Sequence, residues 1–423
     1  MIAIIGGGAA GMFAALCILT QNPCAKVMVI EKMDRVGKKL LATGNGCCNF
    51  TNINMREKNF HGSDTKAAWN IIENFPPLNV IRFFESIGIF SVTEDNGRVY
   101  PYSYQAQAVL DCLRFKLASL GARIVTGTAI KRIKKEGGHF YLQPDSGNEI
   151  KCEKVVIACG GASYKSLGSN GSGFELLKTL GHTITKLSPA LTQLKTETEH
   201  IKSLEGIKLN AVLRVYGTPE CNNIFEGEEE LFCEQGDLLF ANYGISGPPA
   251  LAASALLHEN EGRCLTARLD FMPEYTEREV TGILHERIKL LKDTVMEDFF
   301  TGMLNKRLGL VILKRAGAGK LSQKSSVLEE NAVNAEKLAG LIKNFSLKVT
   351  GTKGFENSQV TAGGALLSEF NGKTLESKII KGLYAAGEVL DVYGDCGGYN
   401  LHWAFASSYA AALALCAGEQ KGK

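Results

Sequence analysis

The first thirty residues alternate between apolar runs and a glycine-rich break. Ile2 to Ile5 is a short, mostly β-branched run, which predicts a buried parallel strand. The pattern G-x-G-x-x-G follows at residues 6–11, and Met12 to Leu19 has helical composition. Lys26 to Ile30 predicts a second strand, and the acid Glu31 stands at its end. Strand, glycines, helix, strand and acid therefore occur in the order of a βαβ unit.

This order predicts a turn that binds a dinucleotide. Gly6 allows the tight turn, Gly8 lets a pyrophosphate approach the backbone, and Gly11 lets the helix pack on the strand. The phosphates then lie at the helix N-terminus, where N–H groups and the helix dipole favour an anion. Glu31 is where an acid accepts hydrogen bonds from the adenosine ribose. The alternative is a glycine-rich turn in an unrelated α/β protein. The residues predicted to bind cofactor here are Gly6, Gly8, Ala9, Ala10, Gly11, Glu31 and Lys32.

The following segment, residues 31–52, interrupts the helical pattern with glycines and asparagines, and we predict a loop without helix. A loop so rich in small and amide residues suits close wrapping of a flat ring with polar edges, which favours FAD over NAD. Lys38 and Lys39 either approach phosphates or are solvated surface charges. The cofactor contacts predicted in this loop are Lys38, Gly44, Asn45, Gly46 and Asn49.

Further junctions between a strand and glycines lie later in the chain. Lys154 to Tyr164 contains an apolar strand that ends at Gly160-Gly161. The glycine loop at 168–173 opens a helix near Phe174, but its spacing and the lack of a strand directly before it argue against a second dinucleotide site. The residues predicted to bind cofactor at the first of these junctions are Cys159 and Gly160.

The last junction lies near the C-terminus. Gly382 to Ala386 predicts a strand, a glycine loop follows, and small and apolar residues predict a helix from about Asn400 to Leu415. Reduced flavin carries negative charge on its pyrimidine edge, so a helix start aimed there would raise the affinity of the flavin for electrons. The alternative is a core helix of small residues. The cofactor contacts predicted here are Gly387, Glu388, Gly398, Asn400 and Leu401.

The middle of the chain has a different rhythm. Residues 189–272 alternate short apolar runs with turns, which predicts a small β-barrel or sandwich. Residues 273–345 place apolar residues three and four apart, which predicts amphipathic helices. We therefore expect an α/β protein in which residues 1–188 and 346–423 form a discontinuous Rossmann-like FAD-binding domain, with the barrel and the helical subdomain inserted.

Composition narrows the class of protein. The 423 residues are 45% hydrophobic and 22% charged, with a net charge of +3, which is too mild to indicate nucleic acid or a membrane surface as partner. Twelve cysteines occur without CxxC or Cys/His ligand spacing, so we predict no metal site and reduced thiols in a cytoplasmic protein. The first apolar run is broken after five residues and lacks a basic leader, so we predict neither a signal peptide nor a membrane span.

Several long motifs then resemble one family. They include GGGAAG, GKKLLATGNGCCNFTN, GRVYPYSYQAQAVLD, LLFANYGISGPPAL, VTAGGALL and GLYAAGEVLDVYGDCGGYNLHWAFASS. From position 1 to about 415 the chain is similar to the bacterial FAD-dependent oxidoreductases labelled BaiN-like, YhiN-like or aminoacetone-oxidase-like. The resemblance implies FAD in a fold related to glutathione reductase, with adenosine at 6–11 and Glu31 and isoalloxazine among 44–49 and 397–401. It also implies a backbone contact to adenine near Ile130.

The chain departs from the family pattern at three positions near this chemistry. Cys47 stands where the family usually has Arg, and His402 stands where many members have Gln. The acid expected near Ser172 is absent. Substrate assignments that come from the resemblance are therefore open.

Candidates for proton transfer lie in the loops on the flavin side. We predict His402, Tyr399 and Cys396 as catalytic residues, and Tyr393 and Asp395 are further candidates. The ordinary reading of each is a helix-face or loop residue with no catalytic role. Adjacent Cys47 and Cys48 would form a disulfide only with a distorted peptide, so a packing role is favoured over a redox role.

These patterns leave two classes of function open. The first is an FAD-dependent oxidoreductase that transfers a hydride between NAD(P)H, the flavin and a small or medium apolar substrate. The family resemblance implies an enone of a steroid or bile acid as one such substrate, because some members are labelled bile-acid reductases. An amine or aminoketone oxidase that uses oxygen is a variant of it. The second class is a non-catalytic or RNA-associated flavoprotein. NAD(P)H is expected as a transient reductant, whereas the sequence leaves monomer and homo-oligomer open.

Overall fold

The computed structural model describes residues 1–219, 227–326, 328 and 333–420. The predicted segments 189–272, 273–345 and 346–423 each include residues outside this set. The chain divides into two compact units, Met1–Ala190 with Gly354–Lys423, and Leu191–Lys353.

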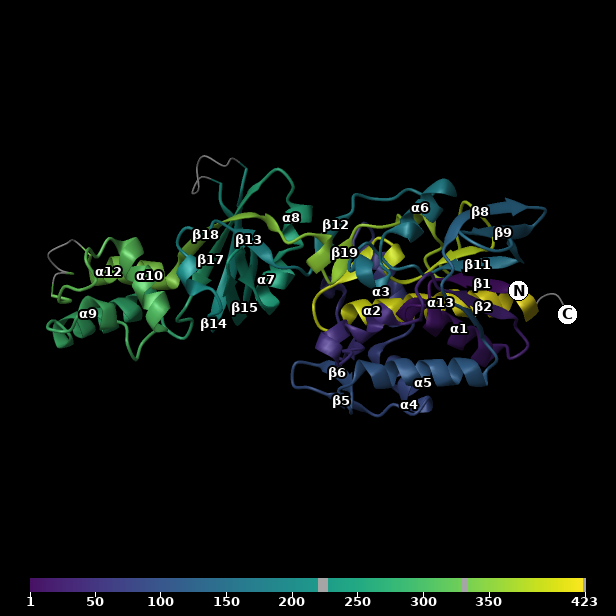
Figure 1. Cartoon of the computed structure of the whole chain (residues 1–423), viewed down its shortest axis with the longest axis horizontal. Helices are drawn as coiled ribbons and strands as arrows, with labels where there is room; N and C mark the ends of the chain where they lie inside the picture. Colours follow the sequence, from purple (N-terminus) through teal and green to yellow (C-terminus); the bar gives the residue numbers. More distant parts are fainter. Residues whose placement is uncertain (220–226, 327, 329–332, 421–423) are drawn as a thin grey trace. The chain divides into compact units, whose positions relative to one another are not determined.

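The first unit is built on a parallel sheet of five strands in the order β20-β11-β1-β2-β7. β1 and β2 are buried along their whole length, which matches the uninterrupted apolar runs of their sequences. Sequence neighbours are not always sheet neighbours, because β11 enters the sheet on the far side of β1 (Figure 1). The strands are β1 (Ile2–Ile5), β2 (Val27–Ile30), β7 (Arg123–Val125), β11 (Lys154–Ile157) and β20 (Leu383–Ala385).

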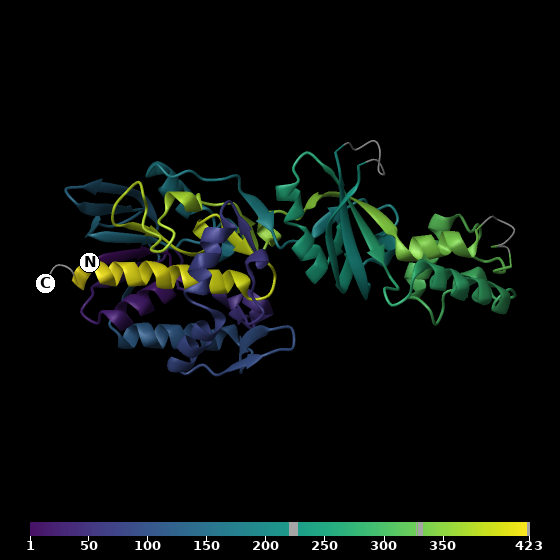
Figure 2. The ribbon, with the colours of Figure 1, turned by 180° about the vertical axis from the view of Figure 1, so that it is seen from behind.

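Two helices pack side by side against this sheet, α1 (Ala9–Gln21) and α13 (Tyr399–Gln420) (Figure 2). The Ser408 hydroxyl donates to the carbonyl of Ala10 at 2.9 Å, and Cys416 lies against the carbonyl of Ile18. Positions 10 and 18 of α1 are thus paired in order with 408 and 416 of α13. The helices run in the same direction, and both N-termini point to the same end.

Smaller elements surround the sheet. The remaining strands of the unit are β3 (Thr51–Asn52), β4 (Phe60–Gly62), β5 (Ser91–Thr93), β6 (Arg98–Pro101), β8 (Ile130–Glu136), β9 (His139–Pro144), β10 (Ile150–Cys152), β12 (Ser188–Ala190), β19 (Val360–Ala362) and β21 (Val392–Gly394). The remaining helices are α2 (Lys38–Leu41), α3 (Thr65–Glu73), α4 (Pro77–Ser86), α5 (Ala106–Ser119) and α6 (Ser172–Thr179). Aromatic contacts of Phe13 with Phe75, Phe83 and Phe405 join α1, α4 and α13 into one core.

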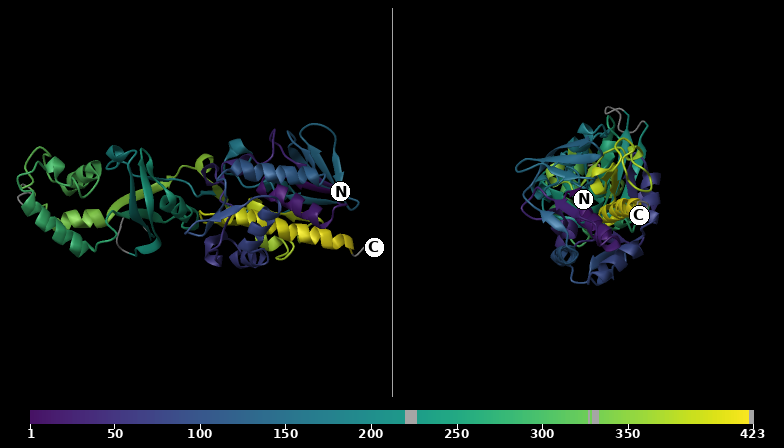
Figure 3. Two further views of the ribbon diagram at one scale, coloured as in Figure 1. Left: turned by 90° about the horizontal axis from the view of Figure 1, so that it is seen from below. Right: turned by 90° about the vertical axis from the view of Figure 1, so that its right-hand side faces the viewer.

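The second unit is a closed barrel with helices beyond one end of it (Figure 3). The barrel order is β13-β16-β15-β14-β17-β18, and barrel and helices share one buried core. The strands are β13 (Leu194–Thr196), β14 (Lys208–Thr218), β15 (Glu229–Ala241), β16 (Gly244–Ser246), β17 (Cys264–Asp270) and β18 (Phe345–Thr352). The helices beyond that end are α9 (Glu277–Leu290), α10 (Lys306–Ala316) and α12 (Ala335–Lys343), whereas α7 (Pro248–Ala253) packs on the barrel strands and is followed by α8 (Leu256–Glu259).

The predicted α/β fold class is confirmed, and two local expectations are corrected. The chain returns to the first unit at Gly354 rather than at 346, because β18 pairs with β13 and β17 and closes the barrel. The segment 31–52 is not wholly a loop, because Lys38–Leu41 forms one helical turn. The separation of barrel and helices into two subdomains stays a prediction.

Cysteines and membrane character were also predicted from the sequence. Ten of the described cysteines are free thiols, whereas Cys264 is in a disulfide, so the expectation that every thiol is reduced is wrong at that position. Among the described helices, none combines the length and the apolar character needed to cross a membrane. Within the same residues, no three His, Cys, Asp or Glu side chains are grouped as they would be around a metal ion.

Candidate cofactor site

The three glycines of the first turn have three different surroundings. Gly6 has φ +112°, and a Cβ built on it would lie 2.3 Å from the carbonyl oxygen of Ala158. A Cβ on Gly11 would lie 1.8 Å from the carbonyl oxygen of Gly6, so helix and strand approach too closely there for any side chain. A Cβ on Gly8 would meet nothing within 4 Å. The open space in front of the α1 N-terminus, beside Ala9 and Ala10, is therefore the part of the turn with room for a diphosphate.

Glu31 is fixed by backbone donors at the end of β2. One carboxylate oxygen accepts from the N–H of Gly7 at 2.7 Å and the other from the N–H of Met33 at 2.8 Å. The N–H of Thr128 donates to the carbonyl of Glu31, which holds the segment before Ile130 alongside. Each carboxylate oxygen keeps a lone pair, so the group is held in place with acceptor capacity left for ribose hydroxyls.

The predicted lysines have protein partners. Lys32 donates to Asn170 and to Ser172 at the start of α6, and burial lowers the pKa of Lys32. Lys38 forms an ion pair with Asp34 at 2.5 Å. In these positions both side chains hold neighbouring protein segments, and the predicted contact of either ammonium with a phosphate stays a prediction.

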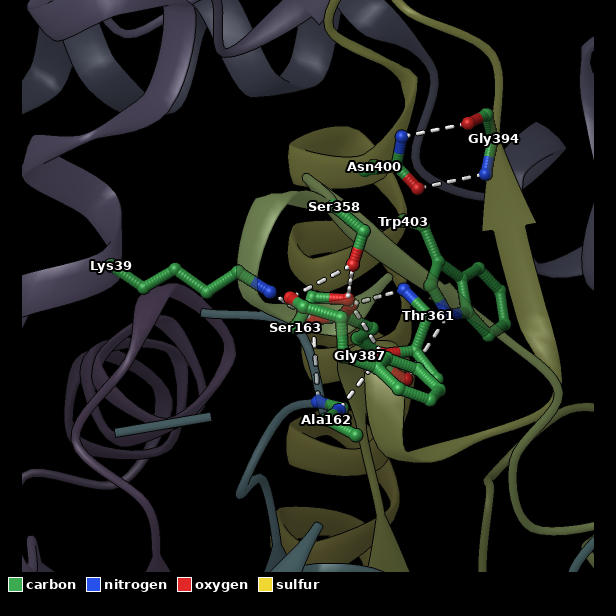
Figure 4. Close-up of polar contacts among 12 residues, drawn as sticks. Lys39, Ala162, Ser163, Ser358, Thr361, Gly387, Gly394, Asn400 and Trp403 are labelled. Atoms are coloured by element: carbon green, nitrogen blue, oxygen red, sulfur yellow. Dashed lines mark hydrogen bonds and ion pairs between the residues drawn. The ribbon is translucent and has the colours of Figure 1, made fainter. Parts of the chain in front are cut away.

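Glu388 joins four segments at the carboxyl edge of the sheet. Its carboxylate accepts from Lys39 Nζ at 2.7 Å, from the N–H of Thr361 at 2.9 Å and from the N–H of Gly161 at 3.3 Å. Figure 4 shows Lys39 pointing toward the cluster of Ser163, Ser358 and Thr361, in which the Ser163 hydroxyl is bonded to those of Ser358 and Thr361. Glu388 therefore braces the loops after β11 and β20. The sequence alone gave no signal for Lys39 or Thr361 as its partners, because they are distant along the chain.

Gly387 lies between the start of α1 and the second turn of α13. A Cβ built on it would be 2.9 Å from the Cβ of Ala10, while its carbonyl accepts from the indole of Trp403 at 3.2 Å and its N–H donates to Ser407. From the pairing of position 10 with 408, α13 extends about 12 Å beyond the start of α1 at 1.5 Å per residue. We call the line of residues from Glu31 past Gly8 and Gly387 to the start of α13 the cofactor track. That an extended cofactor lies along it stays a prediction.

One buried hydroxyl on this track has no partner. Ser169 is 3% exposed, and its Oγ makes no hydrogen bond among the described residues. It would lie 3.2 Å from a Cβ built on Gly160, which has φ +71°. Cys159 precedes this glycine, its thiol contacts the carbonyl of Ile5, and burial raises its pKa to about 12. The unpartnered Ser169 hydroxyl, next to a glycine without a side chain, suits contact with a polar ligand. Cys159 is a protonated thiol that packs against β1.

The two loops predicted to hold the isoalloxazine meet in space. A Cβ on Gly398 would lie 2.4 Å from the carbonyl oxygen of Thr51 and 2.7 Å from Asn49 Oδ1. Asn52 Nδ2 donates to the carbonyl of Gly397 at 3.1 Å. Asn49 is 8% exposed, and its Oδ1 has no hydrogen-bond partner among the described residues. A buried acceptor without a donor fits a ligand that supplies an N–H group.

Other predicted contacts in these loops are placed differently. The Asn400 side chain donates to the carbonyls of Gly394 and Asp395 and accepts from the N–H of Gly394, so it braces the loop before α13 (Figure 4). Gly44, Asn45 and Gly46 are exposed, and Leu401 is half-buried. Their contact with a cofactor stays a prediction.

His402 is placed in the core. It has no exposed surface, its Nδ1 is 2.8 Å from the Thr51 hydroxyl, and its burial lowers its pKa to about 3. A proton donor to substrate needs a surface open to the site and a titrating ring. The structure therefore argues against the predicted acid/base role of His402 and indicates a neutral ring that positions the start of α13.

This burial predicts a pH effect on stability. Between the ordinary pKa of 6.5 and the lowered value, the unfolded chain binds a proton at His402 that the folded chain does not. Stability should therefore fall as pH decreases through this range, by up to about 1.4 kcal/mol per pH unit. Between pH 7 and about pH 5, the His402→Gln variant should lose less stability than the wild type, as measured by thermal unfolding. The control His200→Gln changes a histidine for which the described residues provide no ion pair, and it should follow wild type. Identical slopes for all three proteins would contradict the assignment.

The other proposed catalytic residues lie beside this core position. Tyr399 is 8% exposed, and burial together with Asp395 raises its pKa, so its hydroxyl stays protonated. Cys396 is half-buried in the loop before α13. Cys48 is buried, with its pKa raised to about 12, and both it and Cys47 are thiols, which favours packing over a redox pair. Their catalytic roles stay predictions.

Sequence reasoning missed His61. It lies on β4 opposite Tyr393 of β21, stacks on that ring at 5.0 Å and forms an ion pair with Asp395 at 2.8 Å. Asn59 also donates to Asp395. The sequence gives little indication of this contact, because positions 59–61 and 393–395 are far apart along the chain and are brought together only in the fold, where they pair over three residues.

Comparison with known proteins gives the chain a family. The model of the HI0933-like protein Rossmann domain matches residues 1–414. A 3-dehydro-bile acid delta(4,6)-reductase of Clostridium scindens is 35% identical over 98% of both chains. A ribosomal RNA dihydrouridine synthase of Haemophilus influenzae is 26% identical over 97% of both chains. A quinol-fumarate reductase structure is 16% identical, with a TM-score of 0.50. The match covers all of this chain and 72% of the reductase chain.

Proposed function

This chain belongs to the HI0933-like Rossmann family, the FAD-dependent oxidoreductases that its motifs resemble, and from that premise we propose a specific reaction. The proposed enzyme binds FAD, takes a hydride from NAD(P)H and reduces a carbon–carbon double bond conjugated to a carbonyl. The observation that carries the proposal is the cofactor track, which joins an open glycine turn, a fixed ribose acceptor and a second helix start along one sheet edge.

Residues of the track have distinct roles in holding the cofactor. The N–H groups at the start of α1, open in front of Gly8, bind the diphosphate. Glu31 accepts from the adenosine ribose, and Ser169 with Gly160 faces the polar linker. Asn49 Oδ1 accepts from an N–H group of the ring. When bound, FAD supplies a two-electron acceptor and donor, and the protein orients it and excludes water.

Chemistry shared by the named relatives defines the substrate class. The 4,6-diene beside a 3-oxo group and the 5,6 double bond of uracil are both conjugated to a carbonyl. Conjugate reduction adds a hydride to the β carbon and a proton to the α carbon, and NAD(P)H plus one proton supply both. Tyr399 begins α13 at the end of the track, its hydroxyl stays protonated, and we propose it as the donor of that proton.

Charge favours a small substrate over RNA. The chain has 47 Lys and Arg against 44 Asp and Glu. An RNA-binding enzyme depends on phosphate neutralisation, which requires a clear basic excess on one face. We therefore propose a small or medium apolar enone as substrate. Reduction of a uridine in RNA is the second candidate, because two ribosomal RNA dihydrouridine synthases match almost the whole chain.

Anaerobic mixing separates these possibilities. FAD-loaded protein is mixed with NADH or NADPH while the flavin absorbance is followed, and a steroid enone or a uridine-containing RNA is then added. We expect bleaching by a nicotinamide faster than for free flavin, and recovery of the colour with the steroid enone. Recovery with RNA alone would transfer the assignment to the second candidate. Absence of bleaching by either nucleotide, with turnover of an amine in oxygen, would support an oxidase instead.

A further inference from the structure

One arginine lies where the two flavin-side loops meet. Arg98 begins β6, and a Cβ built on Gly397 would lie 3.3 Å from its Nε and 3.3 Å from the ring of Tyr399. From the same strand, the ring of Tyr100 lies 3.5 Å from a Cβ built on Gly44. Arg98 and the two tyrosines therefore connect the predicted ring-binding loop 44–49 with the start of α13.

The positive charge of Arg98 is not taken up by a carboxylate. Among the described residues it forms no ion pair, and the two acids of this region are engaged elsewhere. Asp395 is bonded to His61 and Asn59, and Glu94 contacts the Tyr104 hydroxyl. Arg98 acts instead on neutral neighbours, since its charge opposes the rise that burial gives to the pKa values of Tyr100 and Tyr399.

An independent observation at the same turn points to a ligand. Asn49 Oδ1, more than nine-tenths buried and without a donor, lies 2.7 Å from the Cβ position of Gly398, at the turn that starts α13. One buried acceptor, the Arg98 guanidinium and the N-terminus of α13 therefore meet around the turn at Gly397 and Gly398, and the guanidinium and the helix N-terminus contribute positive potential there. The pyrimidine edge of isoalloxazine presents the complementary pattern, one N–H between two carbonyls.

We propose that Arg98 is the fixed positive charge that stabilises the negative charge which two-electron reduction places on the pyrimidine ring. This rests on the proposed function. Reduction delivers a hydride from the nicotinamide to the ring, which becomes anionic while the nicotinamide becomes cationic. A guanidinium in a partly buried site interacts with the reduced ring and little with the neutral oxidised ring, so it raises the reduction potential of the flavin.

The test compares Arg98→Met with Arg98→Lys and with Arg132→Met, which removes an exposed arginine of β8. The midpoint potential of bound FAD is measured by photoreduction against a reference dye, and the affinity for sulfite, which forms an anionic adduct, is measured by titration. In Arg98→Met we expect the equilibrium constant for reduction of bound FAD to fall about tenfold, which corresponds to a midpoint potential about 30 mV lower for this two-electron couple. Sulfite should bind at least about tenfold more weakly, whereas Arg98→Lys and Arg132→Met should stay close to wild type.

Other outcomes are equally decisive. Unchanged potential and sulfite affinity in FAD-loaded Arg98→Met would overturn the role of Arg98. If that variant does not retain FAD during purification, the same measurements are made on Arg98→Gln in excess FAD, with the same expectation. Because EDTA, a sacrificial donor, supplies the electrons under illumination, no nicotinamide or enone is involved. A wild-type protein that binds no FAD would overturn the proposed function itself.

Discussion

Gly8→Val is expected to fold normally and to lose FAD. The backbone of Gly8, at φ −83° and ψ −167°, suits a β-branched residue, and a Cβ built there meets no protein atom within 4 Å. The added methyl groups occupy only the space in front of the α1 N-terminus, where we place the diphosphate. Affinity for FAD should fall on the order of a hundredfold or more, equivalent to about 3 kcal/mol. Titration of apoprotein with FAD, together with thermal unfolding, measures both effects.

Two glycines provide matched controls for this variant. Gly282→Val places the same side chain in open space on α9 and should change neither FAD affinity nor the fold. Gly11→Val pushes a side chain into the carbonyl of Gly6 and should fail to fold stably. Normal FAD affinity in Gly8→Val would show that the diphosphate lies elsewhere.

Glu31→Gln is expected to weaken both FAD binding and the fold. The carboxylate accepts from two backbone N–H groups, and an amide replaces one of its oxygens with a donor, so one N–H loses its acceptor. This costs about 1–3 kcal/mol of stability in a half-buried site. Loss of charge and of one ribose acceptor should reduce FAD affinity by about tenfold or more. Calorimetric titration and thermal unfolding report the two effects separately.

The control for this variant is Glu136→Gln, an exposed acid at the end of β8. It should match wild type in both measurements. If Glu31→Gln lost stability but kept full FAD affinity, the carboxylate would be a brace of the turn only, and the ribose would be held by other groups.

Local patterns in the sequence were sufficient for the βαβ unit and its glycines. Strand, turn and helix lie within thirty residues there, and the surroundings found at Gly6 and Gly11 are those that the spacing predicts. The Rossmann-type fold class followed from the same unit and is confirmed by the sheet order.

Features that depend on distant segments were beyond the sequence. Glu388 is bonded to residues from three other segments, and the barrel closes through β18, which follows the inserted helices. His402 looked accessible because small residues surround it in sequence, yet packing of α13 against β3 buries it completely. Arg98 was missed for a similar reason, since only the fold brings β6 to the start of α13.

The central claim is that this polypeptide holds FAD along the edge where α1 and α13 begin. The most direct measurement is the visible absorbance of the purified protein, followed by identification of the nucleotide that heat releases from it. We predict a yellow protein that releases FAD in near-stoichiometric amount. A colourless protein that takes up no FAD from excess during reconstitution would contradict the account.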